Sequence, residues 1–275
     1  MKIGNGPVII PWDFTPEAEN ALKHAVRIAR QINKEIVLLH IVKKKNEAEE
    51  SHNKLNTTAE EMAEKYQIKI TGSIKPGKIF TAIGEYANEV DAELVVMGTH
   101  GVKGVQKITG SWALKVIVHS DVPFIVVKQP PGNSEYKKVV MPVDYKTETK
   151  EKVNYVKYLF TLYGSEFYML KPNFTDVAFI QKTKANIAFC KHFLEKRDIR
   201  FEVHIAEGKK NFAEETIAFA KKNNADMIMI MASKNLTVTD YWIGAQEQYI
   251  IGNEEGIPVM VINPAKGLGK FVTFN

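Results

Sequence analysis

Short, unbroken apolar runs alternate along the chain with longer stretches in which apolar residues recur at helical spacing. An unbroken apolar run is typical of a strand that is buried on both faces, as in a parallel sheet. Apolar residues three or four positions apart indicate an amphipathic helix. In the first half, this pattern predicts strands at 8–12, 35–42, 68–74, 93–97 and 123–127, and helices at 16–33, 47–66, 79–89 and 111–119. Such alternation predicts an α/β fold with a doubly wound parallel sheet.

The same pattern occurs twice. An apolar run that ends in Pro-x-Asp-aromatic is found at residues 8–14 and again at 139–145. Further matching segments follow in the same order: 77–88 with 208–222, 92–97 with 225–230, and 123–127 with 258–262. We therefore interpret the chain as a tandem duplication. The polar, Pro- and Gly-containing stretch between the repeats is typical of a linker, and we expect domains at residues 1–130 and 135–275.

A glycine cluster follows one of the predicted strands. The run 94–97 continues into Gly98-Thr99-His100-Gly101, and Gly110-Ser111 then opens the next helical stretch. Glycine lets the backbone come close to a ligand, and the N–H groups at a helix N-terminus bind anions. This combination predicts a phosphate-bearing ligand, a nucleotide above all.

Asp13 lies just past another predicted strand end. In a doubly wound sheet, ligands bind beyond the carboxyl ends of strands, where the strand order reverses. A carboxylate there can accept hydrogen bonds from ribose hydroxyls or from an adenine amino group. Aspartate and glycine are also common turn residues, so Asp13 and Gly98 each have a structural explanation as well. Their position at the ends of two strands expected to be neighbours favours the nucleotide site.

The glycine cluster does not provide phosphate-cleaving machinery. Trp112 follows Ser111, and no lysine follows Gly110, so the segment is not a Walker P-loop. Lys103 and Lys107 could offset phosphate charge, but no carboxylate is placed to hold magnesium. Because phosphoryl transfer needs a positioned nucleophile and charge stabilisation, we expect no enzyme, and at most slow ATP hydrolysis or autophosphorylation.

The Pro11-x-Asp13 motif, the strand at 92–98 and the series Gly98-x2-Gly101…Gly110-Ser111 resemble the universal stress protein family. The resemblance covers nearly the whole chain as two tandem domains. It implies a Rossmann-like, adenine nucleotide alpha hydrolase-like domain with a five-stranded parallel sheet in each half. It also implies pairing through the last strand of each half, so that the chain forms an intramolecular pseudo-dimer. Some members of the family bind ATP, and others bind no nucleotide.

Carried over by position, the resemblance gives a nucleotide-binding set in the first half. Asp13 would contact the adenosine and the backbone at Ile41 the adenine. Gly98 and Gly101 would lie against ribose and phosphate. The full expected set is Pro11, Asp13, Ile41, Met97, Gly98, Gly101, Gly110 and Ser111. The spacer at 102–109 has eight residues where the family usually has nine, so we expect a tighter phosphate loop.

The second half keeps Asp144 but loses the glycines. Met231-Ala232-Ser233-Lys234 stands where the glycine cluster would recur, and Gly244-Ala245 replaces Gly110-Ser111. We expect this half to bind no nucleotide. Its aromatic residues are expected to pack in the core or an interface rather than line another pocket; they are Tyr241, Trp242 and Tyr249.

Composition and charge limit the class of protein and its possible partners. The chain has 45% apolar and 25% charged residues, as a globular protein has. The net charge of +5 comes with lysine patches that lack interleaved aromatics, so we expect no nucleic-acid partner. No apolar run approaches the roughly 20 residues that span a membrane, and we expect a cytoplasmic location. The single cysteine, Cys190, is expected in the core, and the seven histidines show no metal-ligand spacing, so we expect no metal site.

Three functions remain open. The first is a stress-response protein that binds ATP in its N-terminal domain and acts as a sensor or interaction module. The second is a nucleotide-independent scaffold that binds a protein or a small ligand. The third is a relative of electron-transfer flavoproteins or nucleotidylyltransferases, although the histidine motif of the latter is missing. A protein partner and a homodimer of two pseudo-dimers are compatible with the first two.

Overall fold

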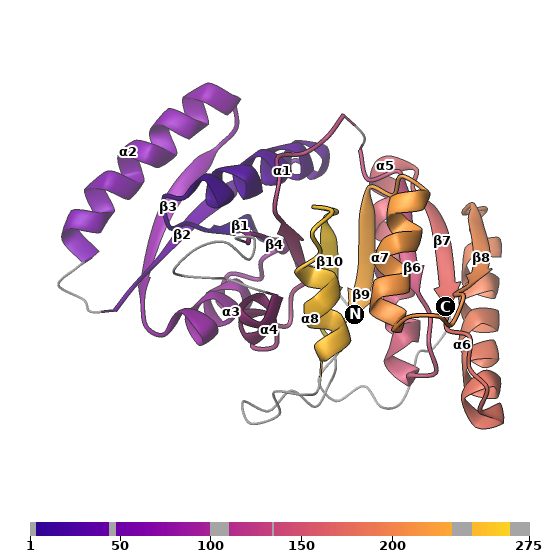
Figure 1. Cartoon of the computed structure of the whole chain (residues 1–275). Helices are drawn as coiled ribbons and strands as arrows, with labels where there is room; N and C mark the ends of the chain where they lie inside the picture. Colours follow the sequence, from indigo (N-terminus) through magenta and orange to yellow (C-terminus); the bar gives the residue numbers. More distant parts are fainter. Residues whose placement is uncertain (1–3, 44–47, 100–109, 134, 233–243, 265–275) are drawn as a thin grey trace.

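The computed structural model of the chain describes residues 4–43, 48–99, 110–133, 135–232 and 244–264. All of its strands belong to one ten-stranded sheet with the order β3-β2-β1-β4-β5-β10-β9-β6-β7-β8. The two halves lie side by side along this sheet, and β5 meets β10 in the middle (Figure 1).

The first half follows the expected alternation closely. Its strands are β1 (Val8–Pro11), β2 (Ile36–Val42), β3 (Ile70–Pro76), β4 (Leu94–Gly98) and β5 (Phe124–Val127). Its helices are α1 (Pro16–Ile32), α2 (Ala48–Tyr66), α3 (Ile79–Glu89) and α4 (Gly110–Ile117). The β3 strand lies two residues later than expected, and the other elements begin and end within two residues of the predictions.

The second half repeats the order of the first. Its strands are β6 (Lys138–Pro142), β7 (Glu166–Lys171), β8 (Phe201–Ile205), β9 (Met227–Met231) and β10 (Val259–Ile262). Its helices are the 3₁₀ helix η2 (Thr147–Lys152), α5 (Val153–Tyr163), α6 (Val177–Glu195), α7 (Phe212–Lys222) and α8 (Ala245–Ile251). Strand pairing is parallel within each half. The α/β prediction with two tandem doubly wound halves is therefore confirmed.

The last strands of the two halves pair as the pseudo-dimer requires. β5 and β10 run antiparallel, with Val126 opposite Val259 and Phe124 opposite Val261. Asn263, just after β10, adds a polar contact, because its Nδ2 donates to the carbonyls of Ile117 and Ser120 at 2.7 Å each. The expected pairing of the last strands is confirmed.

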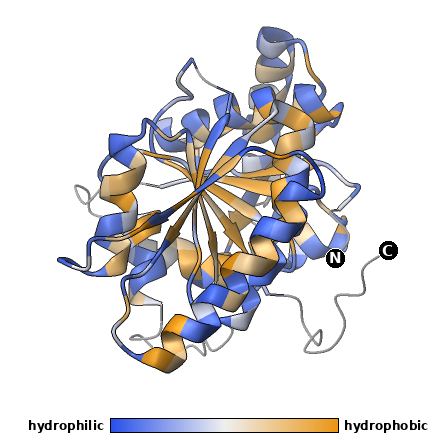
Figure 2. Ribbon diagram, turned by 90° about the vertical axis from the view of Figure 1, so that its right-hand side faces the viewer, coloured by the Kyte–Doolittle hydropathy of each residue, from blue (hydrophilic) through white to orange (hydrophobic). Residues whose placement is uncertain are grey.

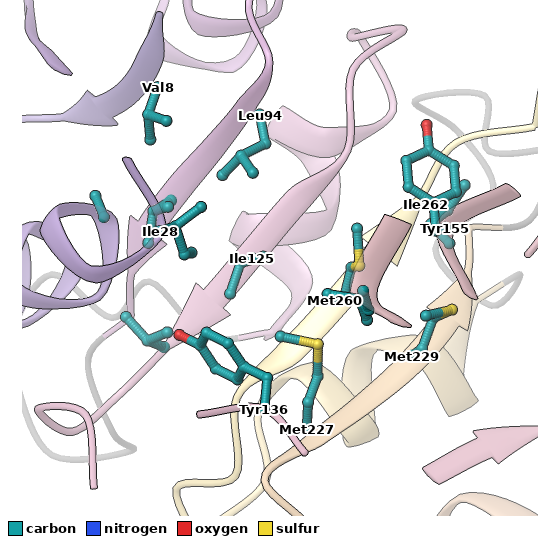
Figure 3. Packing of buried hydrophobic residues seen from close by; sticks show 14 of the residues in the cluster. Val8, Ile28, Leu94, Ile125, Tyr136, Tyr155, Met227, Met229, Met260 and Ile262 are labelled. Atoms are coloured by element: carbon teal, nitrogen blue, oxygen red, sulfur yellow. The ribbon is translucent and has the colours of Figure 1, made fainter. Parts of the chain in front are cut away.

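Helices cover both faces of the twisted sheet (Figure 2). The core forms two apolar clusters, and each cluster contains residues of both halves. One lies on the face of α1, α2, α5 and α6, and the other on the face of α3, α4, α7 and α8. Figure 3 shows how Ile125 of the first half and Met227 and Met260 of the second lie along the same face. Cys190 is fully buried in this cluster, as its sequence setting predicts.

A buried histidine fastens α1 to the segment between the halves. The Nε2–H of His24 donates to the Gln129 carbonyl at 3.1 Å, so its Nδ1 accepts from the Tyr136 hydroxyl. Burial lowers the pKa of His24 to about 4, although the bond to Gln129 favours the protonated form. The imidazole is therefore neutral at pH 7 and acts as a structural link.

Candidate functional site

The sheet order places the ends of β1 and β4 next to each other. Val8 pairs with Leu94 and Ile9 with Val95, in parallel. From β1 the chain continues into α1 on one face, and α4, which follows β4 in the chain, lies on the opposite face. This divergence is the strand-order reversal at which α/β sheets bind ligands.

A cavity of about 80 Å³ lies at these strand ends. Five of the eight residues expected to bind nucleotide line it: Pro11, Asp13, Ile41, Met97 and Gly98. They come from three different strands or strand ends, and the fold brings them together.

The remaining three expected residues belong to the following segment. Gly101 lies outside the described residues. Gly110 and Ser111 are the first two residues of α4, and Val116 of the same helix lines the cavity. The α4 helix thus runs from the glycine-serine pair to the cavity wall.

Asp13 is exposed and is fixed by the turn that follows it. Its Oδ1 accepts hydrogen bonds from the Thr15 amide at 3.2 Å and from the Thr15 hydroxyl at 2.5 Å. Thr15 in turn caps α1, since its Oγ1 accepts from the Ala18 amide. Phe14 between them adopts a left-handed backbone, with φ of 62°. The turn therefore holds the Asp13 carboxylate at the cavity through one oxygen.

Gly98 has a packing reason to be glycine. A β-carbon built at this position would lie 2.2 Å from the carbonyl oxygen of Glu17 in the first turn of α1. Real β-carbons never approach a backbone atom so closely. The close passage of α1 over the end of β4 therefore requires glycine, whether or not a ligand binds there.

An aromatic wall that was not predicted from the sequence lies beside Asp13. His40 of β2 lines the cavity, and its Nδ1–H donates to the Trp12 carbonyl at 2.7 Å. The centroid of the Phe14 ring lies 5.3 Å from that of His40 and 6.2 Å from that of Trp12. The Nζ atom of Lys54 lies 4.1 Å from the centroid of the Phe14 ring. The alternation Trp12-x-Phe14 was the available signal.

The Trp12 indole adds an unusual polar atom to this wall. Trp12 is only 4% exposed, and its Nε1 has no hydrogen-bond partner among the described residues. A buried indole N–H usually finds a partner, so the wall of the cavity holds a donor that the described part of the protein does not satisfy.

The second half has a larger cavity at the corresponding strand ends, which sequence analysis also missed. It measures about 290 Å³ and lies at the ends of β6 and β9. Asp144, Lys146, Lys152 and Glu247 line it together with apolar side chains. Among the aromatics expected to pack in the core or an interface, Tyr249 is 52% exposed, so it does not lie in the core. Tyr241 and Trp242 lie outside the described residues.

In the described ranges, no group of three or more His, Cys, Asp or Glu side chains is placed to hold a metal ion. Of the helices that the structure describes, none is both long and apolar enough to cross a membrane.

The chain is similar in sequence to universal stress proteins in each comparison with known sequences. The model of the universal stress protein family matches residues 4–128. A universal stress protein of Methanocaldococcus jannaschii is 30% identical over 143 residues, which are 45% of this chain and 82% of that protein. A second universal stress protein of the same organism is 26% identical over 160 residues, covering 47% of this chain and 98% of the relative.

Solved structures share the fold over both halves. A universal stress protein from Archaeoglobus fulgidus DSM 4304 superposes with a TM-score of 0.75 at 16% identity, over 96% of this chain and 98% of the other. A putative universal stress protein from Pseudomonas aeruginosa UCBPP-PA14 gives 0.64 at 14% identity, over 94% and 93%. The architecture of the whole chain is therefore found in other two-half proteins.

Proposed function

Since the chain belongs to the universal stress protein family, we propose that its first half is a domain, residues 1–130, that binds ATP or another adenine nucleotide. Residues 135–275 form a second domain of the same fold without this activity. The observation that carries the proposal is the meeting of Pro11, Asp13 and Met97 with Ile41 and Gly98 around one cavity.

The cavity offers complementary groups for a nucleoside. The Asp13 carboxylate accepts hydrogen bonds from ribose hydroxyls, and the backbone at Ile41 faces the edge of the base. Ile79, Ile83 and Val116 supply apolar walls. Ligand sites commonly combine such walls with a few fixed polar groups.

The phosphates would lie toward the start of α4. Gly110 and Ser111 begin this helix, and free N–H groups at a helix N-terminus bind phosphate oxygens. Gly101 belongs to the same proposed cradle. The Ser111 hydroxyl would add one further hydrogen bond.

The proposed role is that of a cytoplasmic stress-response sensor or interaction module rather than an enzyme. Backbone amides and one hydroxyl hold phosphates without activating a nucleophile, and efficient phosphoryl transfer needs such activation. Nucleotide occupancy would instead set the surface that a protein partner meets.

A nucleotide-independent scaffold is the second candidate, and a specific observation favours it. The motif residues Asp13 and Gly98 each have a structural task, in the turn before α1 and in the passage of α1 over β4. These tasks would retain both residues even if no nucleotide bound.

Calorimetric titration of ATP into the full-length chain distinguishes the two candidates. We expect one site per chain, lost in Gly110→Asp because a carboxylate at the start of α4 repels phosphate. Asp13→Asn and Asp144→Asn form a matched pair from the two halves, and only Asp13→Asn should weaken ATP binding. Absence of binding to the wild type at millimolar ATP, or equal effects of the matched variants, would favour the scaffold.

A further inference from the structure

The second half differs from the first at the strand end beside its cavity. Met231 pairs with Ile262 in the same register as Gly98 pairs with Val127. A side chain at this position prevents the close passage that α1 makes over β4. Accordingly, the segment after β6 is the 3₁₀ helix η2, and α5 begins only at Val153. The space beside the strand ends is about 290 Å³ instead of about 80 Å³.

A buried lysine lines this cavity. Lys152 is 3% exposed and, counted from the two aspartates, stands where the first half has the core residue Ala21. Its Nζ donates to the Pro142 carbonyl, and no described carboxylate forms an ion pair with it. Burial lowers the pKa of Lys152 to about 8, while the nearby Asp144 charge opposes this shift. At pH 7 the side chain is therefore mainly an ammonium group, and it forms no ion pair with a described residue, which is costly for a buried charge.

Asp144 supplies an acceptor in the same cavity. Its Oδ1 accepts from the Lys146 amide at 3.0 Å and from the Thr149 hydroxyl at 2.9 Å. Asn186 holds the same loop, since its Nδ2 donates to the carbonyls of Asp144 and Lys146. Both side-chain bonds of Asp144 within the described residues go to one oxygen, so Oδ2 can receive a donor from a ligand.

The other charges at the cavity are engaged with each other. Lys146 Nζ lies 3.4 Å from Glu247 Oε1, and Glu247 is buried on α8. Burial opposes the charge of Lys146, but the carboxylates of Glu247 and Asp144 overcome this and raise its pKa. Glu148 also lines the cavity and has further interactions of its own. Lys152 and Asp144 thus present one positive and one negative group to a ligand.

The remaining walls are apolar. Phe212 of α7, Ile230 of β9 and Ile250 of α8 face the same space. The volume of about 290 Å³ leaves room for a small organic ligand beside the charged groups. Met231 stands where the first half has Gly98, so the backbone at this strand end cannot come as close to a phosphate as a glycine would allow.

We propose that this cavity is a second ligand site, which binds a small aliphatic α-amino or α-hydroxy acid. The carboxylate of the ligand pairs with Lys152, its neighbouring ammonium or hydroxyl group donates to Asp144, and its aliphatic chain packs against Phe212 and Ile250. The site is independent of nucleotide binding in the first half.

One methionine in each cavity makes the test site-specific. Met231 lines the second cavity and Met97 the first. Methyl spectra of the full-length chain labelled with [methyl-¹³C]methionine, assigned from Met231→Leu and Met97→Leu, therefore report the two sites separately. The probes are L-leucine, its α-hydroxy analogue, isocaproate (which lacks the donor) and L-leucinamide (which lacks the carboxylate).

We expect L-leucine or its α-hydroxy analogue to shift the Met231 signal saturably and to leave Met97 in place. A preference between the two identifies whether the donor is an ammonium or a hydroxyl group. Isocaproate should bind more weakly than the better of these two acids, and L-leucinamide should not displace that acid. A stronger response to L-leucinamide than to L-leucine would overturn the proposal, as would a Met231 signal that no probe moves at millimolar concentration.

Two variants test the assigned roles. Lys152→Met should weaken binding of the better acid at least tenfold, while Lys157→Met, an exposed lysine of α5, should have no effect. Asp144→Asn should remove the preference of the site for the better acid over isocaproate. An unshifted Met97 signal verifies that each variant is folded, and Asp144→Asn decides the matter if Lys152→Met does not fold. Wild-type affinity in both site variants would contradict the proposal.

Discussion

The carbonyl oxygen of Glu17 occupies the place that a side chain on Gly98 would need, 2.2 Å from the position of its β-carbon. The start of α1 therefore packs directly on the end of β4. In the second half Met231 takes the corresponding place in the sheet register, and a 3₁₀ segment precedes α5. The cavity at this strand end measures about 80 Å³ in the first half and about 290 Å³, with charged side chains in its lining, in the second.

The contact predicts the effect of a methyl group at position 98. Gly98→Ala should lower the free energy of unfolding by about 1–3 kcal/mol or more, because the backbone of α1 must move away. Gly132→Ala is the matched control, since no atom lies within 4 Å of the added carbon there. Urea unfolding measures both variants. Equal stability of the two would show that the α1–β4 contact is looser than described.

His24 predicts a dependence of stability on pH. Its pKa is lowered to about 4 in the folded protein, from 6.5, so between these values the unfolded chain binds more protons. Stability should therefore rise as pH increases from about 4 to about 6.5, by roughly 3 kcal/mol in total from this group. Urea unfolding of wild type and His24→Gln at several pH values isolates the contribution. The exposed His192→Gln variant should keep the wild-type slope, and a wild-type slope in His24→Gln would refute the assignment.

Lys152 predicts a pH limit for ligand binding in the second half. Its pKa is lowered to about 8, so affinity for the α-hydroxy acid should fall about tenfold between about pH 7 and pH 9 as the ammonium charge is lost. The other groups facing Lys152 are Asp144, Lys146, Glu148, Glu247 and Cys190. Burial raises the pKa of the Cys190 thiol to about 11, and the raised pKa of Lys146 keeps that side chain charged. Titration of the Met231 methyl signal at both pH values measures the effect, and unchanged affinity would contradict it.

The hydrogen bonds of Asn263 are expected to couple the unfolding of the two halves. Asn263→Ala leaves the buried carbonyls of Ile117 and Ser120 without their partner, at a cost of about 2 kcal/mol. Asn253→Ala is the matched control, because the Asn253 side chain bonds only to Ile250 and Ile257 among the described residues. Its backbone carbonyl, which accepts from Lys128 of the first half, is kept in the variant. Both variants should lose stability in calorimetry, but only Asn263→Ala should broaden or split the transition. A single sharp transition in both would mean that the β5–β10 pairing and the shared apolar clusters couple the halves without Asn263.

The fold could be predicted because its signals are local. The buried strands are short runs such as Val8–Pro11 and Phe124–Val127, and the repeat of Pro-x-Asp at Asp13 and Asp144 shows the duplication directly. Thr15 and Pro16 mark the start of α1 by ordinary capping chemistry.

The site could be predicted only in part because other contributions depend on register and packing. His40 meets Trp12 because β1 and β2 pair with Pro11 opposite Leu39, which no sequence pattern specifies. Lys152 stands in a run of charged residues that is typical of a solvated helix face. Only the packing of η2 against the sheet buries it.

The most direct test of the central claim is titration of ATP into the [methyl-¹³C]methionine-labelled chain. The account predicts that Met97 of the first cavity shifts saturably and that Met231 of the second does not. It also predicts that Asp13→Asn weakens the effect at least tenfold while Asp144→Asn leaves it unchanged. A Met97 signal that stays in place at millimolar ATP, or that moves only together with Met231, would contradict nucleotide binding in the first half.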